Sequence, residues 1–235
     1  MSNAEGRERR VIVWDLPTRI FHWSLVILIV VAWFTGEEEG GVHMLAGSAI
    51  AGLLVFRLFW GIVGGEHARF SDFAVGPNAI LAHVRDLFSA RPHRHLGHNP
   101  LGGVAVLLML GVLVAVVGTG LFSGDDQIRG PFASAGRDFS EVHELAFRML
   151  QALVVIHILG VVFETFKARD PLVPAMVRGW KPRRAEEAGS NAKRAPLAAA
   201  IVATLLGVAT SIGLMMASPA GDSASYEQEV ANEHD

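Results

Sequence analysis

Cysteine is absent from this chain of 235 residues. Without thiols the chain can hold no disulfide, no thiolate-bound iron–sulfur cluster and no thioether-linked c-type haem. Charge is also sparse, because only 18% of the residues are Asp, Glu, Lys or Arg, and the formal net charge is −3. This overall balance gives no sign of an electrostatic partner, and we expect no nucleic-acid partner.

Long apolar segments dominate what is present. Hydrophobic residues make up 51% of the chain, and its mean hydropathy is +0.38. They gather in five runs, at residues 17–35, 43–63, 101–122, 142–166 and 196–217. Each run has about the 20 residues that an α-helix needs to cross a hydrocarbon core of about 30 Å. Because lipid offers the backbone no hydrogen-bond partner, the runs predict an all-α integral membrane protein rather than a soluble enzyme.

Lysine and arginine are distributed unevenly between the two sides of these spans. They gather in the N-terminal arm, between the second and third spans, and between the fourth and fifth spans. The opposite side holds only Arg129 and Arg137, together with 13 acidic residues. The positive-inside rule then predicts a protein of the bacterial inner membrane with its N-terminus in the cytoplasm and its C-terminus in the periplasm.

The chain divides into four expected parts. Residues 1–182 hold the first four spans and form a compact membrane domain. Residues 183–195 are charged and alanine-rich, which indicates a flexible cytoplasmic linker. The fifth span, 196–217, follows as an appended helix, and residues 218–235 form an acidic periplasmic tail. Within the first part, apolar residues at helical spacing after Pro77 predict a short amphipathic helix on the inner membrane surface.

Four of the ten histidines lie within or at the ends of predicted spans, where an ionisable side chain is costly and points to function. Counted from the span centres, His22 and His157 lie about 6 and 5 Å to the cytoplasmic side of the membrane midplane. By the same count His43 and His143 lie about 15 and 16 Å to the other side. The four histidines therefore fall into two level pairs, each drawn from two different helices.

The spacing within the fourth span supports this pairing. His143 and His157 are 14 residues apart, which returns to within about 40° of the same helix face. One helix would thus present a ligand to each of two stacked sites, about 21 Å apart along its axis. The other interpretation is four unrelated histidines that hydrogen-bond between helices.

Imidazoles in pairs favour one kind of metal site. Zinc takes three or four ligands close together, whereas these histidines come in twos. Two trans imidazoles without a thiolate suit a six-coordinate b-type haem, which passes electrons rather than binding oxygen. The sequence therefore predicts two haems, one held by His22 and His157 and the other by His43 and His143.

Other residues near the histidines could serve the same sites. Gly47 and Gly160 would let a porphyrin approach the helix, or they could be positions of close helix packing. Arg19, Arg57 and Arg148 are candidates to pair with haem propionates, since an arginine fork matches a carboxylate. Arg19 and Arg57 could instead be interfacial anchors.

Several short motifs together resemble the bacterial cytochrome b561 family, which includes the cytochrome b subunits of nickel–iron hydrogenases. The motifs are VWDLPTRIFHW at 13–23, His43 followed by Gly47, FRLFWG at 56–61, HARF at 67–70, HNP at 98–100, and VHE at 142–144 followed by His157. The resemblance covers roughly residues 11–182. It implies that the matching histidines ligate two b haems in a four-helix bundle, and that the protein exchanges electrons with membrane quinone and a redox partner. The fifth span and the tail have no counterpart in that bundle.

A more distant resemblance, to formate dehydrogenase membrane subunits, implies a quinone beside the cytoplasmic-side haem. In those proteins it lies near an Asn-Xaa-Gly element, and Asn99-Pro100-Leu101-Gly102 is similar but one residue longer. Asn99 and the adjacent His98 are thus candidates for the quinone site. The simpler interpretation is an N-cap followed by a proline in the first helical turn.

Three functions follow from these observations. The first is a di-haem cytochrome that transfers electrons between the quinone pool and a periplasmic c-type cytochrome, dehydrogenase or hydrogenase. The second is a non-catalytic anchor and electron relay within a larger oxidoreductase. The third, from another class, is a transporter that uses its histidines as a proton relay.

Overall fold

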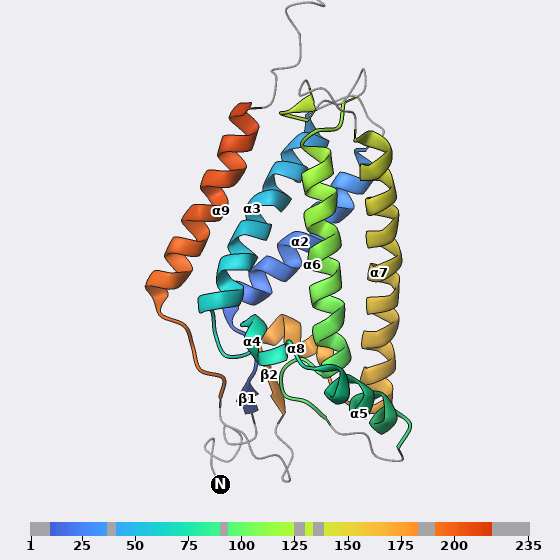
Figure 1. Ribbon diagram of the computed structural model, residues 1–235. Coiled ribbons are helices and arrows are strands. Elements are labelled where there is room, and N and C mark those ends of the chain that lie inside the picture. Colours follow the sequence, from blue (N-terminus) through green and yellow to red (C-terminus); the bar gives the residue numbers. More distant parts are fainter. Residues whose placement is uncertain are drawn as a thin grey trace, which may run out of the picture.

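The computed structural model describes residues 10–36, 41–89, 94–124, 130–133, 139–182 and 191–217. Five long helices run alongside one another, and the short elements gather at one end of them (Figure 1). The long helices are α2 (Leu16–Phe34), α3 (Val42–Val63), α6 (Pro100–Gly120), α7 (Ser140–Lys167) and α9 (Leu197–Ala217). All five are long and apolar enough to cross a membrane. The chain is thus a multi-pass membrane protein, and the five predicted spans are confirmed within two residues at every end.

Local sequence explains where two of these helices begin. Asp15 is the N-cap of α2, and its carboxylate accepts a hydrogen bond of 2.8 Å from the backbone N–H of Thr18. Asn99 is the N-cap of α6 in the same way, accepting from the N–H of Gly102. A proline follows each cap, where its missing N–H costs no helical hydrogen bond. The capping interpretation of Asn99-Pro100 is therefore confirmed.

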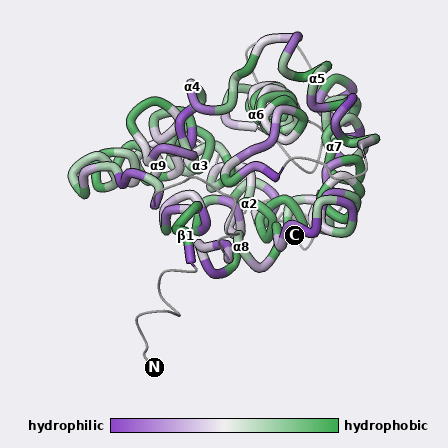
Figure 2. The backbone as a smooth tube through the Cα atoms, turned by 90° about the horizontal axis from the view of Figure 1, so that it is seen from below, coloured by the Kyte–Doolittle hydropathy of each residue, from purple (hydrophilic) through white to green (hydrophobic). Residues whose placement is uncertain are grey.

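The long helices pack as a four-helix bundle with a fifth helix on one flank. Helix α2 packs on α3, α6 packs on α7, and α3 also contacts α6. Large apolar side chains such as Ile27, Ile156 and Leu205 stay exposed, as suits surfaces that face lipid. Figure 2, which views the molecule from the end that carries the short elements, shows apolar residues along the long helices.

Helix α9 lies directly against α3. A Cβ on Gly207 would lie only 2.7 Å from the carbonyl oxygen of Gly52, and a Cβ on Gly52 would overlap Gly207 and the hydroxyl of Ser211. The two backbones therefore approach at a crossing of small residues, as is common between membrane helices. The appended helix is packed on the bundle as closely as the bundle helices are on each other.

A small antiparallel sheet joins the two ends of the first 182 residues, although the sequence predicted only helices. Strand β1 (Arg10–Ile12) pairs with β2 (Trp180–Pro182), so that Arg10 lies opposite Pro182. Three-residue strands are too short to show the alternation that would identify them. We call this end of the molecule, which also carries α4 (Phe70–Phe73), α5 (Pro77–Leu87) and α8 (Leu172–Arg178), the sheet end, and the opposite one the far end. Helix α5 is the predicted amphipathic helix.

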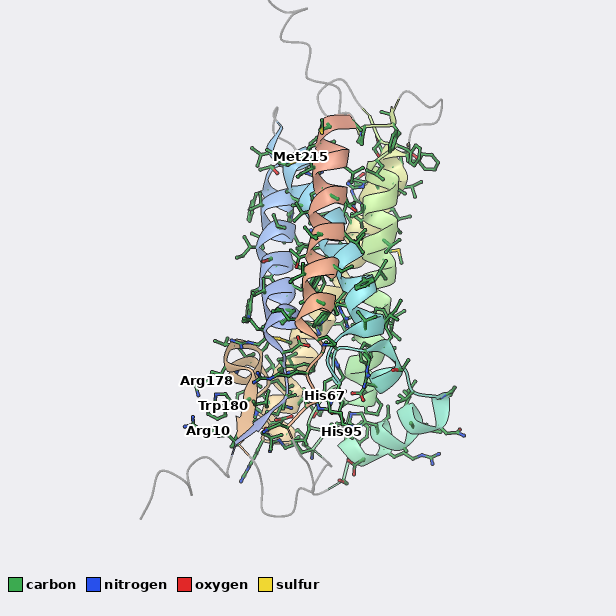
Figure 3. The ribbon with its side chains drawn as sticks, turned by 90° about the vertical axis from the view of Figure 1, so that its left-hand side faces the viewer. Arg10, His67, His95, Arg178, Trp180 and Met215 are labelled. Carbon is green, nitrogen blue, oxygen red and sulfur yellow. The ribbon has the colours of Figure 1, made fainter. Side chains whose placement is uncertain are left out.

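Two arginine side chains pack on a tryptophan ring at the sheet end. The guanidinium groups of Arg10 and Arg178 lie 4.3 and 5.7 Å from the ring centre of Trp180. Figure 3 shows these three residues at the sheet end together with His67 and His95, while Met215 lies at the far end.

Part of the expected linker is described, and it is bound rather than free. The N–H of Ile12 donates to the side chain of Asn191, and the N–H of Lys193 donates to Glu66 at 2.9 Å. This hydrogen bond lowers the pKa of Glu66 below its ordinary value. Residues 183–190 of the linker and the tail from 218 lie outside the described residues.

Candidate functional site

The structure brings His43 and His143 together at the far end. Each lies in the first turn of its helix, α3 or α7, and each is half-buried. Their ring centres are 6.2 Å apart and the ring planes are 80° apart. The two side chains therefore face a shared space from two different helices.

Hydrogen bonds fix the tautomer of both rings. Nδ1 of His43 lies 2.9 Å from the carbonyl oxygen of Ala32, and Nδ1 of His143 lies 2.8 Å from that of Val116. A carbonyl can only accept, so each Nδ1 must carry the hydrogen and donate. Each Nε2 then keeps its lone pair. This is the arrangement that metal-ligating histidines use, with the second nitrogen bonded to a backbone carbonyl.

The separation of these rings fits one metal atom between them. Two metal–nitrogen bonds of about 2.1 Å, with roughly 1.1 Å from each ring nitrogen to its ring centre, would place the two ring centres about 6.4 Å apart. The observed 6.2 Å is close to this value. Among the described residues no group of three or more His, Cys, Asp or Glu side chains could hold a metal ion. A two-histidine site of this kind fits a haem and does not fit zinc.

Two neighbours on α6 hold the ring of His143 in place: the carbonyl group of Val116 and Gly120. The sequence did not predict either of them. A Cβ on Gly120, the last residue of α6, would lie 2.9 Å from Cε1 of His143. The absence of a side chain there lets the end of α6 approach the ring closely enough for the bond to Val116. No pattern in the sequence marks a carbonyl as a partner, and Gly120 is one of 25 glycines.

The second pair, His22 and His157, lies toward the sheet end. His22 is in the second turn of α2, and His157 is on α7, 14 residues after His143. Both rings are half-buried, and a charge on one would be felt by the other. Nδ1 of His22 is buried and has no hydrogen-bond partner among the described residues. Among the described residues, this pair shows no counterpart of the carbonyl contacts that orient the far-end histidines.

Buried arginine nitrogens lie at the same end. Arg57 is only 3% exposed, and it donates one hydrogen bond, of 2.9 Å, to the carbonyl oxygen of Ala68. Arg19 donates to the carbonyl oxygen of Val177, but its Nε is buried without a partner, as is Nε of Arg69. Buried donors that lack acceptors are costly unless an acceptor is supplied. This donor set fits the carboxylates of a haem, and Arg69 adds a candidate to those the sequence suggested.

Three other predicted site residues are placed differently. Arg148 is exposed and pairs with Glu144 one turn earlier on α7, so the structure does not bring it to either histidine pair. Gly47 is half-buried, and a Cβ there would meet no atom within 4 Å. The same holds for Gly160, which is exposed. Of the two glycines, Gly47 is the less exposed.

Asn99 and His98 lie at the start of α6, near the sheet end. Besides capping α6, Asn99 donates from Nδ2 to a carboxylate oxygen of Glu164, at 2.8 Å. The ring of His98 packs 4.7 Å from that of Trp14 and 4.5 Å from that of Phe73. Burial, followed by the positive charge of Arg57, lowers the pKa of His98 to about 3. His98 is therefore neutral in the folded protein at physiological pH.

Comparison with known proteins gives a consistent result. Residues 13–179 match the family model of prokaryotic cytochrome b561. The probable nickel–iron hydrogenase B-type cytochrome subunit of Azotobacter vinelandii is 26% identical over 228 residues, covering 77% of this chain and 94% of that protein. The corresponding subunit of Cupriavidus necator is 23% identical over 209 residues, covering 72% of this chain and 86% of that protein. The probable B-type cytochrome subunit of nickel–iron hydrogenase 1 of Escherichia coli K12 is 24% identical over 212 residues, covering 72% of this chain and 89% of that protein.

No solved structure matches the chain. The family match, however, runs from the residues just before α2 to the end of α8 and includes all four paired histidines. The chain therefore belongs to the prokaryotic cytochrome b561 family of electron-transferring b-type cytochromes.

Proposed function

We propose that this protein carries electrons across the inner membrane between a hydrogenase on the periplasmic side and the quinone pool on the cytoplasmic side. Two b haems would be held in the bundle, one by His43 and His143 and the other by His22 and His157. The observation that carries this proposal is the far-end pair, whose rings are 6.2 Å apart with both Nε2 atoms left for a metal.

The residues of the chain have separate tasks in this proposal. A b-type haem held by two histidines would supply one-electron transfer and would leave no position for oxygen. The carbonyls of Ala32 and Val116 hold two of the ligand rings in the correct tautomer. Arg19, Arg57 and Arg69 supply buried donors for propionates at the sheet end. Because His143 and His157 share α7, one rigid helix sets the distance between the two sites, about 21 Å along its axis.

The distribution of arginine and lysine and the names of the related proteins both support the proposed partners. The sheet end carries the arginine-rich segments, so the positive-inside rule places it in the cytoplasm. The far end, with the His43–His143 pair, then faces the periplasm. The relatives compared above are named as subunits of nickel–iron hydrogenases, which supports a hydrogenase as the outer electron donor. A basic c-type cytochrome is the other candidate partner, and the acidic residues on that side favour it.

The quinone would bind at the sheet end, beside the inner histidine pair. Asn99 and His98 lie at this end, and His157 is close enough for a charge on it to be felt at His98. A quinone needs an apolar surface with a few polar contacts. The aromatic packing around His98 and the amide of Asn99 provide both.

The test is haem content in single-histidine variants. The purified protein should show a b-type α-band on reduction and contain two haems per chain. His157→Ala should remove one haem and leave the other, and His43→Ala should remove the other one. His234→Ala, in the tail, is the control and should retain both. Loss of both haems from a variant that stays folded would contradict the pairing, and a wild-type protein without an α-band would favour the histidine-relay transporter.

A second measurement separates the relay from the anchor function. Purified protein in lipid nanodiscs should be reduced by quinol in the absence of any partner. If it holds haem but exchanges no electrons with quinol, it is an anchor that relays electrons only within a larger complex.

A further inference from the structure

A histidine on α5 and a glutamate on α7 lie close together at the sheet end. Nε2 of His83, on α5, lies 3.3 Å from Oε1 of Glu164, on α7. Their side chains are 3% and 13% exposed. Ionisable side chains that are buried this completely are costly unless they are paired, and a buried pair in a polar surrounding is a candidate functional site.

Other polar side chains lie close to this pair. Nδ2 of Asn99 donates to the same Oε1 of Glu164, and the ring of His95 lies 5.1 Å from that of His83. Beyond Glu164, the charges of Asp170 and Lys181 act on it from the segment that follows α7. Asp170 is itself bonded to Lys181, at 2.7 Å. The pair therefore lies at the edge of a polar cluster that extends toward the sheet end.

Glu164 has a defined position relative to the inner histidine pair. It follows His157 by seven residues on α7, which is two helical turns and brings it back to within about 20° of the same face. The separation along the axis is about 10.5 Å. Glu164 also contacts Asn99, the residue placed at the quinone site. It thus lies between that site and the polar cluster.

We propose that Glu164 and His83 form a proton-exchange pair for the quinone. This inference rests on the quinone function proposed above. Oxidation of a hydroquinone to a quinone breaks two O–H bonds and releases two electrons and two protons. The acceptor of the two electrons, taken one at a time, would be a b haem held by His22 and His157. Each proton passes to the carboxylate of Glu164 or to Nε2 of His83, and then to the cytoplasm. Reduction of a quinone runs through the same groups in reverse.

The chemistry of the pair suits this task. A carboxylate and an imidazole nitrogen 3.3 Å apart are close enough to exchange a proton once the ring turns toward the carboxylate. In the structure Nε2 of His83 makes no hydrogen bond with a described residue, so it is left for a proton. Asn99 can only donate to Glu164 through its amide, so it orients the carboxylate without competing for the proton. A structural ion pair that fixes α5 to the bundle would not need to contact Asn99, the residue proposed for the quinone site.

The test compares Glu164→Gln with Glu164→Asp and with Glu66→Gln. Gln keeps the shape and the acceptor for Asn99 but cannot take a proton, whereas Asp restores an acid. Glu66 is a carboxylate at the same end that bonds to the backbone of Lys193, and it is the control for loss of a charge. Haem reduction is followed by stopped flow in nanodiscs with a short-chain ubiquinol, with menaquinol and with dithionite, in H2O and in D2O across a range of pH.

We expect Glu164→Gln to slow reduction by quinol at least tenfold, since positioned proton transfer contributes about 10²–10⁴-fold to rates. Its solvent isotope effect should rise and its pH dependence should flatten, while reduction by dithionite and haem content stay unchanged. Glu164→Asp should recover part of the rate, and Glu66→Gln should behave as wild type.

Two results would overturn the inference, and they differ from each other. If wild-type protein is reduced by quinol and Glu164→Gln keeps the same rate, isotope effect and pH profile, the pair has no role in proton exchange. The same holds if the variant slows haem reduction by quinol and by dithionite equally and melts at a lower temperature. That result is expected if the pair only fixes α5 to the bundle. If neither quinol reduces the wild type, the quinone function itself is wrong and the inference falls with it.

Discussion

Gly120 and His143 are in such close contact that a Cβ on the glycine would lie 2.9 Å from Cε1 of the ring and 3.0 Å from Nδ1. We therefore expect Gly120→Val to displace the ring and break its bond to Val116. The spectrum and midpoint potential of the outer haem should change, or that haem should be lost. Gly118→Val is the matched control, because a Cβ at Gly118 meets nothing within 4 Å. If the two variants had equal effects, the cause would be the change of a glycine in α6 and not the contact between Gly120 and His143.

Asp170 holds two buried cations at the sheet end. It accepts from Arg94 at 2.9 Å and from Lys181 at 2.7 Å, and all three side chains are at most 7% exposed. Removing one partner of a buried ion pair costs about 3–5 kcal/mol, because it leaves a charge uncompensated. Asp170→Asn should lower the free energy of unfolding by that amount, as measured by denaturation in detergent. Glu144→Gln, in the exposed pair with Arg148, should change it by less than about 1 kcal/mol.

The lowered pKa of His98 predicts how stability depends on pH. An unfolded histidine has a pKa of about 6.5, whereas folded His98 has one of about 3. Between these values the unfolded chain binds a proton that the folded protein does not. The stability that depends on neutral His98 is complete above pH 6.5 and declines below it, by about 1.4 kcal/mol per pH unit. His98→Gln should flatten the dependence of the unfolding free energy on pH over this range, and an unchanged slope would mean that His98 is not its source.

The crossing of Gly52 and Gly207 makes a prediction about the fifth helix. A larger side chain at Gly207 would collide with the carbonyl oxygen of Gly52, so Gly207→Leu should separate α9 from α3. Thermal stability should fall, while both haems remain, because α9 contributes no histidine. Gly213→Leu, on the same helix, is the control, since a Cβ there meets no atom within 4 Å. Loss of haem from Gly207→Leu would show that α9 is required by the bundle core.

Acidic residues near the outer histidines predict a salt dependence. Glu141 and Glu144 flank His143, and Glu37 to Glu39, which lie outside the described residues, precede His43 in the chain. If a basic c-type cytochrome is the outer partner, electrostatic steering should speed its encounter. Electron exchange should then slow between about 0.1 and 1 M salt, as the Debye length falls from about 10 to 3 Å. Changing Glu37, Glu38 and Glu39 to Gln should slow electron exchange at low salt and flatten its dependence on salt. A rate that changes neither with salt nor with the triple substitution would exclude electrostatic steering.

The sequence predicted those features that depend on a chemical pattern along the chain. Hydropathy located the spans, and Asn99-Pro100 marked the start of α6. Depth counting put His43 level with His143, and their ring centres do lie 6.2 Å apart. These predictions succeed because a helix has a fixed rise and rotation per residue, so that spacing in sequence becomes position in space.

Features that depend on contacts between distant segments were not predictable. The bonds of the histidines to Ala32 and Val116 use backbone carbonyls, which every residue has. The partner of Glu164 is His83, 81 positions earlier, and nothing in either local sequence names the other.

The pairing of Arg10 with Pro182 closes the four-helix unit on itself. Since the first and last residues of this unit lie side by side, a further segment can be joined there without threading through the helices. Helix α9 is such an addition, and it packs along α3. The same geometry makes the unit a candidate for circular permutation: joining residues 10 and 182 by a short connector and opening the chain in a loop should preserve the bundle.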